Sequence, residues 1–160
     1  MKDGAVSQQV VAINASGSKL DAYLSRALQY EVGRCVQDGK VQSRATIDLR
    51  SDVPLGERPP PYMLGQAEMT DTGPIHSTYV QFHLPRDSRV NTVTLNGEPV
   101  GTFTFEEQSR PGVLVAVKLP PRKKQRIAVD FTEPADDGPA HVVVQPLQYD
   151  PQVVVTDRGC

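Results

Sequence analysis

The stretch that decides the fold is Val113-Leu114-Val115-Ala116-Val117-Lys118-Leu119. Every second residue in it is a branched apolar one, and this period of two places those side chains on one face of a β-strand. Pro120-Pro121 ends the pattern, because proline cannot donate a hydrogen bond to a neighbouring strand. Residues 127–131 repeat the alternation, so this part of the chain predicts amphipathic strands.

Tight turns separate the predicted strands. Asp38-Gly39 and Asn96-Gly97 are strong hairpin signals, because these residues tolerate the positive φ that two-residue hairpin turns require. Another turn is expected at Arg110-Pro111-Gly112. The remaining segments with strand character are 10–13, 28–35, 41–50, 79–84, 90–95, 100–105, 142–144 and 153–155. About nine or ten closely spaced strands are typical of an antiparallel sandwich or barrel.

One segment predicts a helix instead. Ser18 and Asp21 have the spacing of a helix start in which each side chain satisfies the other's backbone donor. From Leu20 to Ala27, apolar residues follow at spacings of three and four, which favours a helix of about two to three turns. We expect this helix to cover an open end or face of a sheet.

The predicted fold class is all-β. We expect residues 1–160 to form a single domain, an immunoglobulin-like antiparallel β-sandwich with one short N-terminal helix. The 14 prolines and 12 glycines are many for a helical bundle, since both residues belong to the corners of strand-and-turn proteins. Crossover helices, which parallel α/β folds need, are missing from the pattern.

Charge and composition disfavour several classes of function. The formal net charge of -2 provides no overall positive field to attract nucleic acid. No run approaches the ~20 apolar residues that cross a bilayer, so membrane attachment would need a segment absent from this chain. The two cysteines, Cys35 and Cys160, are too few for a zinc site; a disulfide between them and two unpaired thiols both remain open.

The sequence predicts no catalytic, metal or cofactor site. The histidines His76, His83 and His141 are scattered, and the motifs of nucleophilic hydrolases, phosphate loops and dinucleotide binding do not occur. The carboxylate pairs Glu106-Glu107 and Asp136-Asp137 could serve as acid and base or as calcium ligands. Because both pairs fall at turns, we interpret them as solvated loop residues.

Two regions hold candidate binding residues. The long segment 51–77 has no regular period, and such segments are usually functional or poorly ordered; alternatively, Tyr62 and Leu64 fix it to the sheets. A basic run before residue 127 could meet lipid headgroups or an acidic envelope polymer, or could be only a soluble strand edge. The candidates are Tyr62, Met63, Leu64, Arg122, Lys123 and Lys124.

Residues 11–24 (Val-Ala-Ile-Asn-Ala-Ser-Gly-Ser-Lys-Leu-Asp-Ala-Tyr-Leu), the segments Val53-Pro54 and 61–65, and the block 115–121 (Val-Ala-Val-Lys-Leu-Pro-Pro) carry a family resemblance. They resemble the C-terminal region of the actinobacterial envelope family filed as domain of unknown function 4012. The family's Pro-Asp-Tyr and Pro-Pro-Gly stand here as Pro-Pro-Tyr, ending at Tyr62, and Pro-Pro-Arg, ending at Arg122. The resemblance covers most of residues 5–132.

The resemblance implies a location more than a function. In that family, this chain would be the extracytoplasmic tail of a longer, membrane-anchored protein of the cell envelope. Our leading hypothesis is a non-enzymatic module that binds or scaffolds a cell-wall glycan or an envelope protein through segment 51–77 and the neighbouring strand ends. The alternative is an accessory domain of an envelope polymer enzyme whose active site lies in a missing N-terminal domain. A glycan-processing enzyme acting through Glu106 or Asp137 is a disfavoured third.

Overall fold

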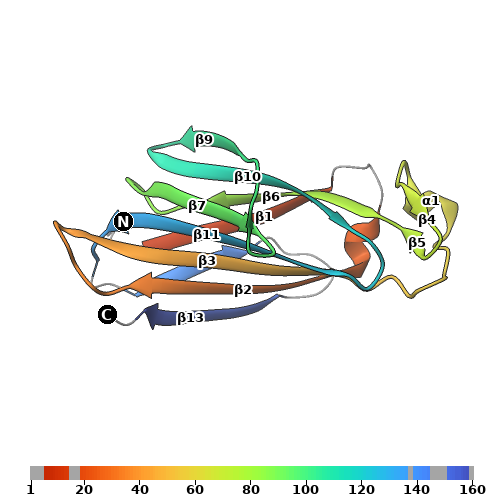
Figure 1. The fold of residues 1–160 in the computed structure, drawn as a ribbon, viewed down its shortest axis with the longest axis horizontal. Coiled ribbons are helices and arrows are strands. Elements are labelled where there is room, and N and C mark those ends of the chain that lie inside the picture. Colours follow the sequence, from red (N-terminus) through yellow and green to blue (C-terminus); the bar gives the residue numbers. More distant parts are fainter. Residues whose placement is uncertain (1–5, 15–18, 137–138, 145–150, 159–160) are drawn as a thin grey trace.

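The computed structural model describes residues 6–14, 19–136, 139–144 and 151–158. Its architecture is all-β, as predicted, with two large sheets in an elongated molecule (Figure 1). The five-stranded sheet has the order β12 (Ala140–Val144), β1 (Val6–Asn14), β6 (His76–His83), β10 (Arg110–Leu119), β9 (Phe103–Glu107). The six-stranded sheet has the order β13 (Gln152–Arg158), β2 (Leu24–Gly33), β3 (Lys40–Ser51), β11 (Lys124–Pro134), β7 (Arg89–Leu95), β8 (Glu98–Pro99).

The two large sheets share one hydrophobic core. The period-two residues of β10 point into it, with Val113, Val115 and Leu119 fully buried. They meet the inward side chains of β3 and β11, among them Ile47 and Phe131. Because most alternate residues of β3 and β11 are polar and point outward, the six-stranded sheet has one apolar and one solvated face.

Both predicted hairpins are confirmed. Asp38 and Gly39 have φ values of 52° and 73° where β2 turns into β3, and Asn96 and Gly97 have φ values of 53° and 85° between β7 and β8. These turns depend on local backbone preferences, which is why the sequence specifies them directly.

The predicted N-terminal helix is wrong apart from one short turn. A 3-10 helix, η1, covers Leu20–Tyr23, and β2 already begins at Leu24, opposite Ser51 of β3. Lys19 stands at the helix start with no side-chain cap, and Ser18 lies outside the described residues. Leu20, Leu24 and Leu28 are buried, so the apolar spacing fits this turn followed by a strand, and pairing with β3 decides the outcome.

The predicted strand 100–105 and the turn after it also need correction. The return from Gly97 pairs for two residues as β8, and the chain then changes sheet to form β9 beside β10. The turn after β9 lies at Gln108 and Ser109, which both have positive φ, while residues 110–112 already belong to β10.

The sheets are not wholly antiparallel. β12 pairs with β1 in parallel, and β13 pairs with β2 in parallel, so each sheet ends in a parallel edge strand. The other pairings between strands of the described residues are antiparallel. The prediction of an antiparallel arrangement is therefore wrong at these two edges.

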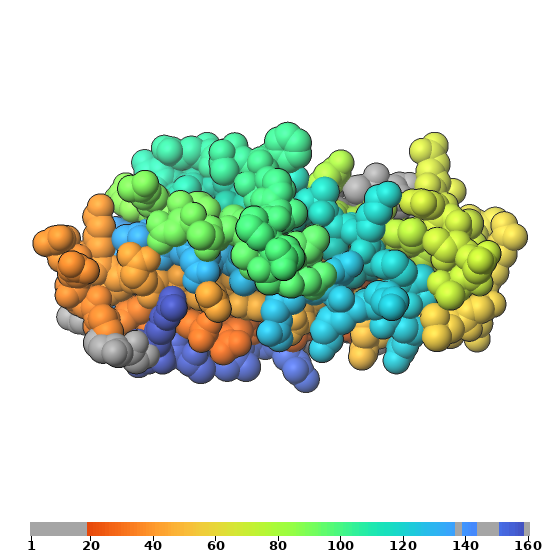
Figure 2. Space-filling view, in the orientation of Figure 1, coloured from red at the N-terminus to blue at the C-terminus, as the bar shows by residue number. Residues whose placement is uncertain are grey.

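The long segment between β3 and β6, residues 52–75, forms an excursion at one end of the molecule (Figure 2, yellow). It contains the four-residue helix α1 (Pro61–Leu64) and a small ribbon of β4 (Met69–Thr70) and β5 (Gly73–Pro74). Within the part of the chain that the structure describes, no helix has the length and apolar character of a membrane span.

Candidate binding groove

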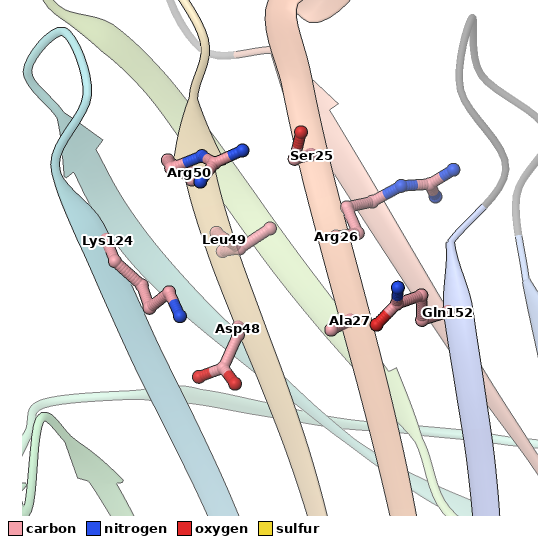
Figure 3. Close-up of a pocket in the computed structure, with 8 residues that line it drawn as sticks. All are labelled: Ser25, Arg26, Ala27, Asp48, Leu49, Arg50, Lys124 and Gln152. Atoms are coloured by element: carbon pink, nitrogen blue, oxygen red, sulfur yellow. The ribbon is translucent and has the colours of Figure 1, made fainter.

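A shallow groove of about 370 Å³ lies on the six-stranded sheet, near the excursion (Figure 3). Its residues come from four strands, of which β11 and β13 lie far from the hairpin of β2 and β3 in the sequence. They are Ser25, Arg26 and Ala27 of β2, Asp48, Leu49 and Arg50 of β3, Lys124 of β11, and Gln152 of β13. The antiparallel register aligns three of these strands, because Arg50 pairs with both Ser25 and Lys124.

A second hollow of about 200 Å³ continues the groove along the strands. It shares Ala27, Asp48 and Gln152 with the first. The two hollows therefore form one extended groove, walled on one side by the edge strand β13. The further residues that line the second hollow are Leu28, Gln29, Thr46 and Val154.

An ion pair fixes the middle of the groove. Asp48 lies directly opposite Arg126 in the register, and its two carboxylate oxygens accept hydrogen bonds from Nε and Nη2 of Arg126, at 2.7 and 2.9 Å. These hydrogen bonds hold the pKa of Asp48 below its usual range. The Asp48 side chain is thus held in one position, and Arg126 balances its negative charge.

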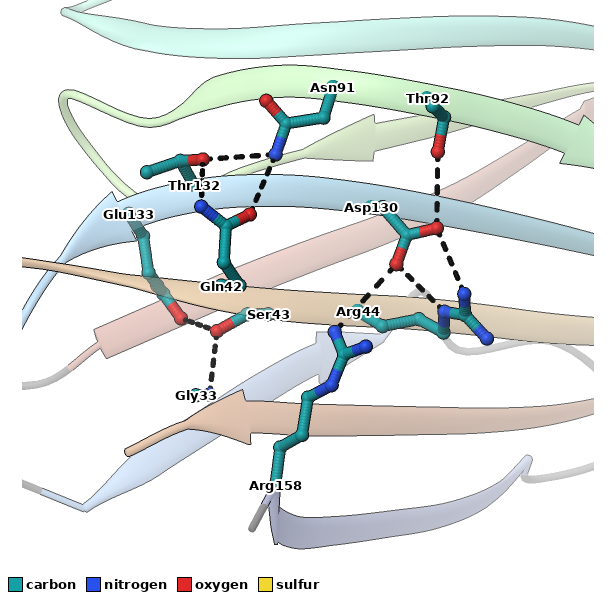
Figure 4. Close-up of polar contacts among 10 residues, drawn as sticks. All are labelled: Gly33, Gln42, Ser43, Arg44, Asn91, Thr92, Asp130, Thr132, Glu133 and Arg158. Carbon is teal, nitrogen blue, oxygen red and sulfur yellow. Dashed lines mark hydrogen bonds and ion pairs between the residues drawn. The ribbon is translucent and has the colours of Figure 1, made fainter. Parts of the chain in front are cut away.

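A second polar cluster follows on the same face (Figure 4). Asp130 accepts hydrogen bonds from Nε and Nη2 of Arg44, at 2.8 and 3.0 Å, and from Thr92 at 3.1 Å. Arg158 of β13 reaches the same carboxylate at 3.9 Å. Burial raises the pKa of Asp130, but the hydrogen bonds from Arg44 and Thr92 and the positive charges of Arg44 and Arg158 together outweigh it and hold the pKa below its usual range.

The end of the groove nearest the excursion is rich in cations. Arg50 donates from Nε to Asp52 at 2.6 Å, and Nη1 of Arg122 reaches the same oxygen at 3.2 Å. Ser25 donates to the other oxygen of Asp52. Arg26 is almost wholly buried and, in Figure 3, extends from β2 toward the side of β13.

The predicted basic residues divide between the groove and the surface around it. Lys124 lines the groove, and Arg122 contacts Asp52, which also binds groove residues Ser25 and Arg50. Lys123 is exposed and does not line it.

The predicted apolar cluster lies on α1, away from the groove residues. Leu64 is 7% exposed and anchors the excursion, whereas Tyr62 is 70% exposed and does not. The ring of Tyr62 lies under Nζ of Lys19, at 5.5 Å from the ring centre. The backbone carbonyl of Met63 accepts a hydrogen bond from the backbone of Lys19. The excursion is therefore fixed by Leu64 and by backbone bonding.

Sequence reasoning missed most of the groove. Arg26, Ala27 and Asp48 look like ordinary strand residues, and Gln152 comes from a strand whose neighbour is more than a hundred residues away. The available signal is the segment 44–50, in which polar residues, three of them charged, alternate with apolar ones. The charges of this segment can be read from the sequence, but the sequence does not show which strands lie beside it.

A buried carboxylate lies at the far end of the same sheet (Figure 4). Glu133 is 1% exposed and accepts hydrogen bonds from the Tyr30 hydroxyl, at 2.7 and 2.9 Å, and from Ser43. Ser43 in turn accepts a bond from the backbone of Gly33 at 2.8 Å. Burial raises the pKa of Glu133 although the two hydroxyls oppose the shift. The contacts are internal to the fold, which indicates a structural role.

We predict that Glu133→Gln stabilises the protein at neutral pH. Because the pKa of Glu133 is raised in the folded state, this group favours folding below its unfolded pKa, and that advantage is lost as pH rises through the folded pKa. Glutamine removes the cost of the buried charge, so the gain in unfolding free energy should be on the order of 1 kcal/mol at pH 8 and vanish at pH 4. Urea unfolding across this range measures it.

Two further variants control this experiment. Glu133→Ala removes the acceptor for Tyr30 and Ser43, so it should destabilise at every pH by about 1–3 kcal/mol. Glu98→Gln, at an exposed position of β8, should have little effect. A Glu133→Gln gain that is equally large at pH 4 would contradict the assignment to a buried charge.

The histidines remain separated in the structure. Nε2 of the fully buried His76 lies 2.7 Å from Asp21 of η1, His83 packs edge-on against Phe105 at 5.3 Å, and His141 is exposed on β12. No group of three or more His, Cys, Asp or Glu side chains that could hold a metal occurs in the described ranges.

The carboxylate pairs lie outside the groove. Glu106 and Glu107 are exposed at the end of β9. Asp136 follows β11, and Asp137 lies outside the described residues.

Cys35 is disulfide-bonded, which excludes a free thiol at this position. Cys160 lies outside the described residues. Cys35 follows β2 by two residues, and β2 ends at Gly33 opposite Arg158, the last residue of β13. Close by, Asp157 of β13 forms an ion pair with Arg34 at 2.8 Å.

Comparisons with known proteins give structural neighbours alone. No known family model matches the chain, and no curated protein matches it. A candidate nutrient-binding protein from Legionella pneumophila subsp. pneumophila str. Philadelphia 1 is 11% identical, with a TM-score of 0.44 over 83% of this chain and 46% of that one.

An M1 zinc metallopeptidase from Deinococcus radiodurans is 14% identical, with a TM-score of 0.35 over 69% of this chain and 20% of that one. A two-domain M1 zinc metallopeptidase mutant bound to L-tryptophan is 15% identical, with a TM-score of 0.35 over 72% and 22%. The chain thus spans less than half of each of these proteins. Similarities at this level say nothing about what this chain binds or catalyses.

Proposed function

We propose that this chain is a non-enzymatic binding module of the cell envelope, built as an immunoglobulin-like sandwich, and that it holds a glycan along the groove of the six-stranded sheet. The observation that carries the proposal is the continuity of the two hollows through Ala27, Asp48 and Gln152. An open groove that follows the strands suits a chain-like ligand better than a compact one.

The side chains of the groove also suit a sugar chain. Ser25, Gln29, Thr46 and Gln152 offer hydroxyl and amide groups along its length, and such groups donate to and accept from sugar hydroxyls. The bidentate pair of Asp48 and Arg126 holds its middle rigid, which reduces the entropy lost when a ligand binds. The resemblance to the envelope family supports the location.

We expect Ala27→Trp to abolish binding of a cell-wall glycan. Ala27 lines both hollows, so an indole at this position would fill the groove where the two parts meet. The measurement is a titration of ¹⁵N-labelled protein with solubilised cell-wall fragments. In the wild type, amide shifts should cluster at residues 25–29, 46–50 and 152–154.

The matched control is Ala116→Trp. Ala116 is an exposed strand residue on the five-stranded sheet, so this variant adds the same bulk away from the groove and should bind normally. Shifts confined to Tyr62–Leu64, or unchanged binding by Ala27→Trp, would remove the groove from the proposal.

A further inference from the structure

On the outward face of β3 and β11, three pairs of charged residues lie directly opposite each other, and one of the three pairs has like charges. Asp48 lies opposite Arg126 and Arg44 lies opposite Asp130, and both pairs are oppositely charged. The third pair, Arg50 opposite Lys124, is two cations. Like charges directly opposite each other on neighbouring strands destabilise a sheet.

The excess of positive charge extends over the whole end of the groove. Four cations, Arg50, Arg122, Lys124 and Arg126, lie at or beside this end with two carboxylates, Asp48 and Asp52. The chain as a whole has a formal net charge of -2. Throughout the described ranges, no carboxylate forms an ion pair with Lys124. This local excess opposes the charge of the molecule.

We propose that the Arg50–Lys124 end of the groove binds an oxyanion, a carboxylate or a phosphate group carried on the glycan. This inference rests on the proposed function and names the chemical class of its ligand. Guanidinium and ammonium groups form charge-assisted hydrogen bonds with such anions, and a guanidinium can hold two oxygens at once. An anion between Arg50 and Lys124 would also offset the repulsion between these two facing cations.

Small molecules of matched size test the charge requirement. Glucuronate and glycerol 3-phosphate should shift the amides of residues 25–27, 49–50 and 124, whereas glucose and glycerol should not. The anion that binds more tightly shows whether the charged group of the ligand is a carboxylate or a phosphate. Lys124→Gln should weaken binding of that anion about tenfold, since a charge-assisted contact of this kind is worth about 1.4 kcal/mol. Added salt should weaken wild-type binding as well.

Lys123→Gln is the matched control, because Lys123 is adjacent and exposed but does not line the groove; it should bind like the wild type. Thermal melting separates binding from structure: removal of one of two facing cations should leave the melting temperature of Lys124→Gln unchanged or higher. Equal binding of glucuronate, glycerol 3-phosphate and glucose, or a normal affinity in Lys124→Gln, overturns the inference. If cell-wall fragments still shift the amide signals of the groove residues, and Ala27→Trp still abolishes these shifts, the proposed function survives that result.

Discussion

Gly33→Ala is expected to lower the free energy of unfolding by about 3 kcal/mol. A Cβ atom at this position would lie 2.3 Å from the backbone oxygen of Gln42 and 2.8 Å from its carbonyl carbon. Backbone atoms of a paired strand cannot rotate away as a side chain can, so β2 and β3 would have to separate locally. The same shift would pull the Gly33 amide from Ser43 and disturb the contacts of Glu133.

Chemical denaturation of the wild type and the variant measures this effect. Gly101→Ala is the matched control, because a Cβ there has no atom within 4 Å and the residue is exposed; its change should stay within about 0.5 kcal/mol. Equal stability of the two variants would show that the end of β2 can move apart from β3 at little cost.

Reduction of the disulfide at Cys35 is expected to cost roughly 2–4 kcal/mol and to loosen β13. This strand is exposed along its whole described length, and it is a parallel edge strand, so few buried contacts hold it in place. The ion pairs of Asp157 with Arg34 and of Arg158 with Asp130 are partly or wholly solvent-exposed and contribute little on their own.

Hydrogen exchange with and without reductant tests this prediction. Amides of residues 152–158 should lose protection on reduction, while those of β3 and β11 keep it, and glycan binding should weaken because Gln152 and Val154 line the groove. The variant Cys35→Ser should behave like the reduced protein and show no further response to reductant. Cys160 is the one other cysteine in the sequence, so we expect it to be the partner of Cys35, and peptide mapping without reductant checks this pairing. Unchanged protection of β13 after reduction would contradict the role of the disulfide.

Local signals made most of the fold predictable. The alternation in residues 113–119 and 127–131, and the positive-φ turns at Asp38 and Asn96, depend on neighbours in the sequence and are confirmed. The segment from Leu20 to Ala27 carries apolar spacing that suits both a helix and a strand. Its pairing with residues 48–51 decides between them, and that contact cannot be seen in the segment itself.

Nonlocal pairing explains the remaining errors and most of the site. The parallel partnership of β13 with β2 joins residues more than a hundred positions apart, and the sequence gives no indication of it. Lys124 was visible as part of a basic run, but its position opposite Arg50 follows from the register of β11 on β3. The charges along one strand can be read from the sequence, but whether they face like or opposite charges depends on which strand pairs with it and in which register.

The direction of the strands determines which end of the molecule would face away from an attachment at either chain end. β1 begins and β13 ends at the same pole of the molecule, whereas the excursion occupies the opposite pole (Figure 1). The cationic end of the groove adjoins the excursion through Asp52. A tether attached at either chain end would therefore hold the molecule by that pole and leave the pole with the excursion and the cationic end of the groove pointing outward, away from the anchor.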